Sequence, residues 1–140
     1  MRKKSKTISQ LKKDAWKVFS EWIRRRDADW RGMVRCCSCG AVKHWKQGDA
    51  GHLEEGRNNS ILFDERGCHF QCKGCNGNLR IGNISRNKEE IKKGYERFML
   101  ERYGQKVIDE IRANKKKTRQ FTIQELESLI KDLKEKISKL

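Results

Sequence analysis

The sequence predicts an α+β protein in which a cysteine-rich segment with a short β-hairpin is flanked by N- and C-terminal helices. Near both ends of the chain, apolar residues recur at spacings of three and four, the period of an amphipathic helix. Between these ends, residues 33–84 hold all six cysteines, all three histidines and most of the glycines. A chain of 140 residues with this pattern has room for one compact core with helical extensions.

The pattern divides the chain into three segments. Residues 1–8 form a basic tail, residues 9–114 form the core, and residues 115–140 form a basic linker and a C-terminal helix. Within the core, the first helix is expected from Ser9 to about Asp29, with its apolar residues on one face and lysines on the other.

Helical spacing returns after the cysteine-rich segment. A helix is expected from about Lys88 to Tyr103, followed by a shorter one over residues 107–111. The sequence from Thr122 to Glu125 has the capping-box pattern, which opens a final helix with an apolar stripe.

The charge balance indicates a polyanionic partner. Lys and Arg number 34 against 19 Asp and Glu, giving a formal net charge of +15. A positive field of this size attracts nucleic acid, with an anionic membrane surface as the alternative. No stretch is apolar enough to span a bilayer, and no signal peptide precedes the first helix. We therefore expect a cytoplasmic protein whose cysteines stay reduced.

Two Cys-x-x-Cys pairs form the strongest motif, and they predict a structural Zn²⁺ site. The four ligands would be Cys36, Cys39, Cys72 and Cys75. Two residues between thiolates allow both sulfurs to reach one ion from a tight turn, and four thiolates satisfy tetrahedral zinc. A redox pair or scattered core cysteines are the alternatives. Cys37 and Cys68 are then spare, although Cys37 could replace Cys36 in a tighter turn.

The hairpin expected over residues 33–45 carries the first pair, and the second pair lies in a turn that opens into a helix. This is the treble-clef arrangement of a zinc knuckle. The same scaffold serves pure binding proteins and nucleases, so zinc alone does not decide between these functions.

His52 is the candidate catalytic residue. It follows Asp49 between the two cysteine pairs, and Asn76 comes directly after the second pair. A neutral imidazole has a pKa close to the working pH and can activate water as a general base. Asp49, His52 and Asn76 could hold a catalytic Mg²⁺ or Mn²⁺ ion. The alternative for His52 is a structural histidine near the zinc.

At these motifs the chain resembles the NinG/Rap family of lambdoid phages. The likeness is carried by RCCSCGAVKHWKQGDAGH and FDERGCHFQCKGCN, and by the flanking AWKVFSEWIRRRDAD and RYGQKVIDEI. It covers about residues 10–135. The resemblance implies a phage recombination endonuclease, built on a His-Asn-His-like treble clef, that cuts branched DNA such as Holliday junctions and D-loops with a divalent metal.

The resemblance also implies residue roles. The four paired cysteines match the zinc positions, His52 matches the base, and Asp64 begins a matching Asp-Glu-Arg. Asp64 would orient His52 or reach the metal, although a plain salt bridge to Arg66 is an equal expectation. His69 matches a histidine just before the second pair.

Two positions depart from the family pattern. Gly67 stands where an Asn braces the loop that carries the base, and Asn58 or Asn59 could take that role. Gly51 precedes His52 where other His-Asn-His nucleases have an acid, so Asp49 would have to supply that metal contact.

DNA contacts are expected from basic clusters and from tryptophans. Trp16, Trp22, Trp30 and Trp45 could stack on exposed bases at a junction, although Trp22 is expected to pack in the core, and Trp45 is the first choice. The predicted DNA-binding residues are Arg24, Arg25, Arg26, Trp45, Arg57, Arg66, Lys73, Arg80, Lys115, Lys116 and Lys117. Such clusters suit sequence-independent phosphate contacts, although any single basic run can be a solvated face. A Holliday junction needs two paired cuts, which a symmetric homodimer provides. The C-terminal helix could form that interface or fold back on its own chain.

These observations predict a metal-dependent, structure-specific endodeoxyribonuclease with a structural zinc. A non-catalytic zinc-dependent DNA-binding module is the alternative, and an RNA-binding zinc-ribbon protein is a third possibility. A binding module would not need His52, Asp64 and Asn76, so these residues discriminate between the first two hypotheses.

Overall fold

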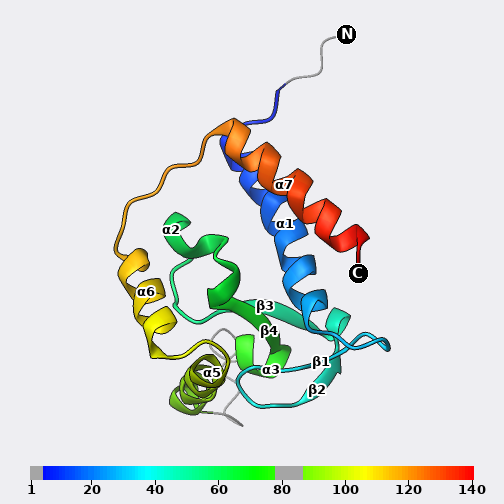
Figure 1. Cartoon of the computed structure of the whole chain (residues 1–140), viewed down its shortest axis with the longest axis vertical. Coiled ribbons are helices and arrows are strands. Elements are labelled where there is room, and N and C mark those ends of the chain that lie inside the picture. Colours follow the sequence, from blue (N-terminus) through cyan, green and yellow to red (C-terminus); the bar gives the residue numbers. More distant parts are fainter. Residues whose placement is uncertain (1–4, 78–86) are drawn as a thin grey trace.

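The computed structural model describes residues 5–77 and 87–140, and Figure 1 shows their arrangement. The elements run in the order α1 (Ile8–Arg26), β1 (Met33–Arg35), β2 (Val42–His44), η1 (Trp45–Gln47), β3 (Gly48–His52), α2 (Asn59–Leu62), η2 (Glu65–Gly67), β4 (Cys68–Cys72), α3 (Lys73–Asn76), α5 (Lys88–Arg102), α6 (Gln105–Lys115) and α7 (Ile123–Ser138). Helices therefore surround a central strand pair, β3–β4 (Figure 1).

Helix α1 begins and ends for local chemical reasons. Thr7 caps its N-terminus in a reciprocal capping box with Gln10. Three arginines occupy its last turn, where positive charge interacts favourably with the helix dipole. The buried residues Leu11, Ala15, Phe19 and Ile23 form one stripe along the helix. The expected first helix is confirmed, and it ends three residues earlier than the sequence suggested.

Helix α7 packs alongside α1, and the two helices are parallel (Figure 1). The Thr122 side chain accepts a hydrogen bond from the backbone N–H of Glu125, which starts the helix where the sequence predicted. Leu126 packs beside Leu11 in one buried cluster, and Leu133 packs beside Ile23 in the next. The apolar stripe of α7 is therefore covered, at least in part, by its own chain.

The strands form two antiparallel pairs. β1 and β2 are the expected hairpin around the first cysteine pair. β3 and β4 pair over their full lengths, from Gly48 opposite Cys72 to His52 opposite Cys68. Because directly opposed residues share a face, His52 lies on the face of β3–β4 that also carries Ala50 and Cys68.

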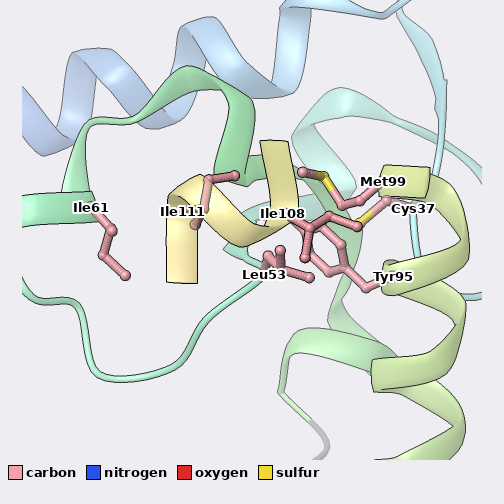
Figure 2. Close-up of a cluster of buried hydrophobic side chains, with 7 residues drawn as sticks. All are labelled: Cys37, Leu53, Ile61, Tyr95, Met99, Ile108 and Ile111. Atoms are coloured by element: carbon pink, nitrogen blue, oxygen red, sulfur yellow. The ribbon is translucent and has the colours of Figure 1, made fainter. Parts of the chain in front are cut away.

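The two faces of β3–β4 pack against different helices. Ala50 and Cys68 contact α1 through Phe19 and Ile23. The opposite face carries His69 and looks toward α5 and α6, where Cys37, Leu53, Ile61, Tyr95, Met99, Ile108 and Ile111 form a buried cluster (Figure 2). A Cβ at Gly94 of α5 would overlap the Ser38 carbonyl, so this glycine lets α5 approach the first cysteine turn closely.

The architecture confirms a mixed fold of helices and small antiparallel hairpins. The treble-clef assignment remains a prediction. Among the helices that the structure describes, none has the length and apolar character needed to cross a membrane.

Candidate functional site

Four cysteine sulfurs converge at one point, as the motif predicted. The Sγ atoms of Cys36, Cys39, Cys72 and Cys75 all lie within 4.8 Å of one another. The Sγ atoms of Cys39 and Cys72 are 3.7 Å apart, and Zn–S bonds of about 2.3 Å in a tetrahedron place sulfurs about 3.8 Å apart. The four cysteines therefore form a site that could bind a metal such as zinc.

Local backbone structure presents these sulfurs. The first pair lies in the β1–β2 turn, which Gly40 closes with a positive φ of 77° and a hydrogen bond from its N–H to the Cys36 carbonyl. Cys72 ends β4 and Cys75 lies in α3. The backbone N–H of Cys72 also donates to the Cys36 sulfur at 3.3 Å, which joins the two halves.

The remaining cysteines lie elsewhere. Cys37 is buried in the cluster between the strand pair and α5–α6, and Cys68 is buried against α1. Burial raises the pKa of both thiols, so both are uncharged near neutral pH. Both were expected to be spare, and neither belongs to the four-sulfur group.

His52 is held by one ring nitrogen, and its ring stacks on a tryptophan. Its Nε2 lies 3.0 Å from the Leu62 carbonyl oxygen. Because a carbonyl can only accept, Nε2 carries the proton and Nδ1 of the neutral ring keeps its lone pair. The Trp16 ring stacks on the imidazole at 5.3 Å between centroids.

The surroundings of His52 favour the neutral imidazole. Burial lowers the pKa of His52 below its ordinary value. The hydrogen bond to Leu62 and the charge of Asp64 oppose this shift, whereas the positive charge of Arg57 adds to it. The Arg57 guanidinium lies 4.5 Å from the centroid of the Trp16 ring, on a backbone with a positive φ of 49°.

Asp49 and Asn76 form a hydrogen-bonded pair beside the cysteine site. Asn76 Nδ2 donates to one Asp49 oxygen at 3.1 Å, and Lys73 Nζ donates to the other at 3.0 Å. Burial opposes ionisation of Asp49, but these two bonds outweigh it and lower the pKa of the carboxyl. Asp49 is therefore a carboxylate at neutral pH, and the amide oxygen of Asn76 keeps its lone pairs.

The structure brings Asn76 and His52 to one small cleft of about 90 Å³, which Gln71 and Tyr95 also line. A cleft of this size can hold an ion with a few waters. Asp49 and His52 leave β3 on opposite faces. In the described part of the chain, the four cysteines are the only preformed group of three or more His, Cys, Asp or Glu ligands.

Asp64 forms a salt bridge with Arg66, which was one of the two expectations for this residue. Arg66 Nε and Nη2 donate to its two oxygens at 3.2 and 3.1 Å, and the Arg66 backbone N–H donates at 3.0 Å. Arg66 also bonds Glu110 of α6 at 2.8 Å. Asp64 therefore ties η2 together, and its influence on His52 is electrostatic.

His69 is enclosed by aromatic rings. It is 1% exposed, its Nε2 lies 2.9 Å from the Tyr103 hydroxyl, and its Nδ1 lies 3.4 Å from the Tyr95 hydroxyl. Burial, with the positive charges of Arg26 and Arg102, lowers the pKa of His69 to about 3. His69 is a neutral residue of the core.

The two glycines that depart from the family pattern have specific contacts. The Gly67 carbonyl accepts from the Leu53 N–H at 2.9 Å, beside His52. A side chain at Gly51 would collide with Gln71, whose amide fills that space and donates to Ser38 at 2.8 Å.

Two asparagines brace the loop that follows His52. Asn58 and Asn59 donate to the carbonyls of Lys115 and Arg119 at 2.9 and 3.1 Å, which tie the loop to the linker before α7.

Several predicted DNA-binding arginines make bonds within the protein. Arg26 donates to the Glu65 and Cys68 carbonyls at 2.9 and 3.0 Å, and Arg24 donates to the Ser20 carbonyl at 3.1 Å. The ring of Trp45 lies 5.2 Å from the guanidinium carbons of both Arg24 and Arg25. Lys115, Lys116 and Lys117 follow α6 into the linker, and Arg80 lies outside the described residues.

Sequence reasoning missed the aromatic contacts of the two histidines. Trp16 was grouped with the other tryptophans as a possible base-stacking residue. Nothing in the sequence paired it with His52. Tyr95 of α5 was not singled out, although its hydroxyl donates to the Gly51 carbonyl at 2.6 Å. A buried tyrosine needs a partner for its hydroxyl, which is the signal that could have drawn attention to it.

A family profile and several phage proteins match the chain. A family profile described as "Bacteriophage Lambda NinG protein" matches residues 1–140. Protein ninG of Escherichia phage lambda and protein ninG of Salmonella phage P22 are each 31% identical over 129 residues, which is 91% of this chain and 56% of theirs. Protein ninG of Escherichia phage 933W is 31% identical over 91% of this chain and 57% of its own.

The chain therefore spans little more than half the length of these relatives. No solved structure matches the chain significantly. The profile match over the full sequence, together with these relatives, shows that the chain belongs to the NinG family of bacteriophage proteins.

Proposed function

We propose that this protein is a metal-dependent, structure-specific endonuclease that cuts branched DNA during phage recombination in the host cytoplasm. The observation that carries the proposal is the state of His52. Its Nε2–H is committed to the Leu62 carbonyl, so Nδ1 keeps a lone pair, on the strand that also carries Asp49. A histidine held in this tautomer is ready to accept a proton from water.

In the proposed reaction, His52 Nδ1 removes a proton from a water molecule that attacks the scissile phosphate. The Leu62 carbonyl fixes the tautomer, and the Trp16 ring limits rotation of the imidazole. The lowered pKa of His52 keeps the ring neutral at the pH of a cell. Each of these contacts supports a base, and none of them requires a covalent intermediate with the protein.

Asn76 at the cleft, together with the Asp49 carboxylate that it bonds, also suits a hard divalent ion. Asp49 and Asn76 offer a carboxylate and an amide oxygen, and Mg²⁺ commonly uses one or two carboxylates while it keeps several waters. Bound Mg²⁺ or Mn²⁺ would stabilise charge on the phosphate and the leaving oxygen. The cysteine site would hold a structural zinc, and we assign the hairpin, β4 and α3 around it to a treble clef of the His-Asn-His type.

The substrate is proposed from charge and from family likeness. A net charge of +15 on 140 residues suits phosphate binding. The resemblance to the NinG/Rap family points to branched DNA, and paired cuts in a four-way junction suit a homodimer. Because α7 covers α1 within one chain, the dimer would use another surface or the outer side of these two helices.

A non-catalytic zinc-dependent DNA-binding module is the second candidate. It is favoured by Asp49, whose two oxygens are already bonded to Lys73 and Asn76. In this alternative, the pair would hold α3 against β3, and His52 would be a packing residue beside Trp16.

The deciding experiment incubates the zinc-loaded protein with a labelled four-way junction and with a duplex of the same sequence. Mg²⁺, Mn²⁺ and EDTA are compared, for the wild type and for His52→Ala. We expect junction cleavage that requires the divalent ion and falls by at least about a hundredfold in the variant. Tight junction binding with no cleavage under either metal would support the binding module instead.

A further inference from the structure

One tryptophan is displayed to solvent, unlike the other three. Trp30 is 93% exposed, whereas Trp16, Trp22 and Trp45 are partly buried. Trp30 is by far the most exposed large apolar side chain among the described residues. A tryptophan has a large apolar ring and a polar N–H, so an exposed one can bury a large area in a contact with a partner.

The turn that carries Trp30 is ordered by its own hydrogen bonds. Asp29 Oδ1 accepts from the backbone N–H groups of Arg31 and Met33 at 2.9 and 3.0 Å. The Gly32 N–H donates to the Asp29 carbonyl at 2.9 Å, and Gly32 has a positive φ of 79° with His44 packed against it. Trp30 is therefore held outward by a built turn, and a ligand would not have to order the loop.

Cationic side chains lie beside this tryptophan and beside its neighbour Trp45. The Arg31 guanidinium lies 5.9 Å from the Trp30 ring centroid, and Arg31 also neutralises Asp29 at 2.9 Å. A hollow beside Trp30 is lined by Arg25, His44 and Trp45. Lys46 Nζ lies 5.5 Å from the Trp45 centroid. This surface therefore combines one exposed aromatic ring with several cationic side chains.

We propose that Trp30 stacks on an unpaired base of the DNA substrate, while Arg25, Arg31 and Lys46 hold the adjoining phosphates. Aromatic platforms with basic flanks are the usual means of binding single-stranded nucleic acid, because every base has a π-face. The proposal rests on DNA as the partner in the proposed function, but it does not require cleavage. It also revises the earlier choice of Trp45, which is partly buried, whereas Trp30 is exposed.

The position of this platform suits a role in choosing branched substrates. Trp45 contacts Arg24 at the end of α1, and His52 contacts Trp16 eight residues earlier on the same helix. Eight residues of α-helix span about 12 Å. Trp30 and Trp45 line one hollow, so a base stacked on Trp30 would lie near the end of α1, about two helical turns from the Trp16 that contacts His52. Fully paired duplex offers no free base at that distance, whereas a branch point does.

The test measures binding of the full, zinc-loaded chain by fluorescence anisotropy in EDTA-free buffer without Mg²⁺ or Mn²⁺. The probes are a twelve-nucleotide oligothymidylate, a four-way junction and a paired duplex. One stacked base contributes about 1–3 kcal/mol, so Trp30→Ala should weaken binding to the first two probes roughly five- to hundredfold. Binding to duplex should change less than about twofold, because phosphate contacts remain. Trp30→Phe should recover most of the affinity.

Leu100→Ala, which removes another exposed apolar side chain, is the matched control and should leave all three affinities unchanged. Equal weakening on all three probes, or none, would overturn the proposal. Unchanged DNA binding with a loss of self-association in sedimentation would instead identify Trp30 as a protein contact. His52→Ala should keep the full Trp30 dependence of binding, so a failure to cleave and a failure to stack are separate results.

Discussion

The two histidines of the β3–β4 pair lie on opposite faces of it and have opposite surroundings. His69 faces α5 and α6, is 1% exposed, and has a tyrosine hydroxyl near each ring nitrogen. His52 faces α1, is half-buried, and has one ring nitrogen bonded to a carbonyl while the other keeps its lone pair. Both rings are held neutral by burial. Only His52 combines neutrality with an available nitrogen.

This difference separates a histidine that completes a core from one that can act on a ligand. A buried ring with both nitrogens near hydrogen-bond partners contributes to stability and has nothing left to offer a substrate. A ring fixed through one nitrogen has a defined tautomer and a free lone pair. One strand pair, with five residues in each strand, thus provides both kinds of site, because side chains alternate between the faces.

Removing zinc from the four-cysteine site, beside the strand pair that carries both histidines, should have the greatest effect. Removing zinc with a chelator, or replacing one ligand by Cys72→Ser, should unfold the cysteine-rich half. Structural zinc in small sites contributes on the order of 10 kcal/mol. Circular dichroism melts and a zinc-release dye would measure the loss. Cys37→Ala is the control, and it should keep one zinc per chain. A ligand variant that stays folded without zinc would show that the core alone suffices.

The second prediction contrasts the two histidines directly. His52→Gln should reduce junction cleavage at least about a hundredfold with little effect on stability, because it removes a base from a half-buried site. His69→Gln should lower the free energy of unfolding by about 1–3 kcal/mol, because it disturbs a buried hydrogen-bonded ring. Its cleavage rate per folded molecule should stay near that of the wild type. The reverse pattern of effects would exchange the two roles.

Much of the fold could be predicted from the sequence, because its signals are local. Thr122 caps the last helix where a polar residue precedes an apolar period, whereas the Thr7 cap lies in the segment that was expected to be a tail. The four-cysteine site was also predictable, since two Cys-x-x-Cys pairs have a spacing typical of zinc ligands. The capping box expected at Thr122 is present as the Thr122 half, with its side chain bonded to the Glu125 N–H.

The contacts around the candidate base could not be predicted, because they join segments far apart in the chain. Trp16 meets His52 across 36 positions, and Asn58 reaches the Lys115 carbonyl across 57. Periodicity places Trp16 on a helix but does not say which strand that helix covers. The exposure of Trp30 likewise depends on how Asp29 and Gly32 shape one turn, which composition does not reveal.

The third prediction concerns pH and sharpens the contrast through stability. The pKa of His69 is about 3 in the fold, against about 6.5 in an unfolded chain. The unfolded state therefore binds more protons between these values. The contribution of neutral His69 to the free energy of unfolding is complete above pH 6.5 and is lost as pH falls toward 3. The full difference is at most about 5 kcal/mol. Chemical denaturation at several pH values would measure it.

The control for this prediction must separate His69 from acid release of zinc. Wild type and His69→Gln should be compared at the same excess of zinc, since thiolate protonation affects both. The groups that face His69 are Arg26 and Arg102, which disfavour its protonation, and Asp27, which favours it. Between pH 6.5 and 4, the free energy of unfolding should fall less steeply in the variant than in the wild type. The same dependence on pH in both proteins would mean that His69 is already solvated and that its burial does not set the acid sensitivity.

The smallest expected effect tests whether the open nitrogen of His52 is tuned by charge. Arg57 lies over Trp16 and lowers the pKa of His52, so Arg57→Gln should raise that pKa, while Arg57→Lys should leave it nearly unchanged. Histidine NMR titration of the folded protein measures this without any cleavage assay. The acid limb of the cleavage profile should move to higher pH in step. Because Arg57 is exposed, the difference should shrink in high salt. A pKa that falls in Arg57→Gln would mean that Arg57 acts by packing on Trp16, and the contrast between the histidines would then rest on burial alone.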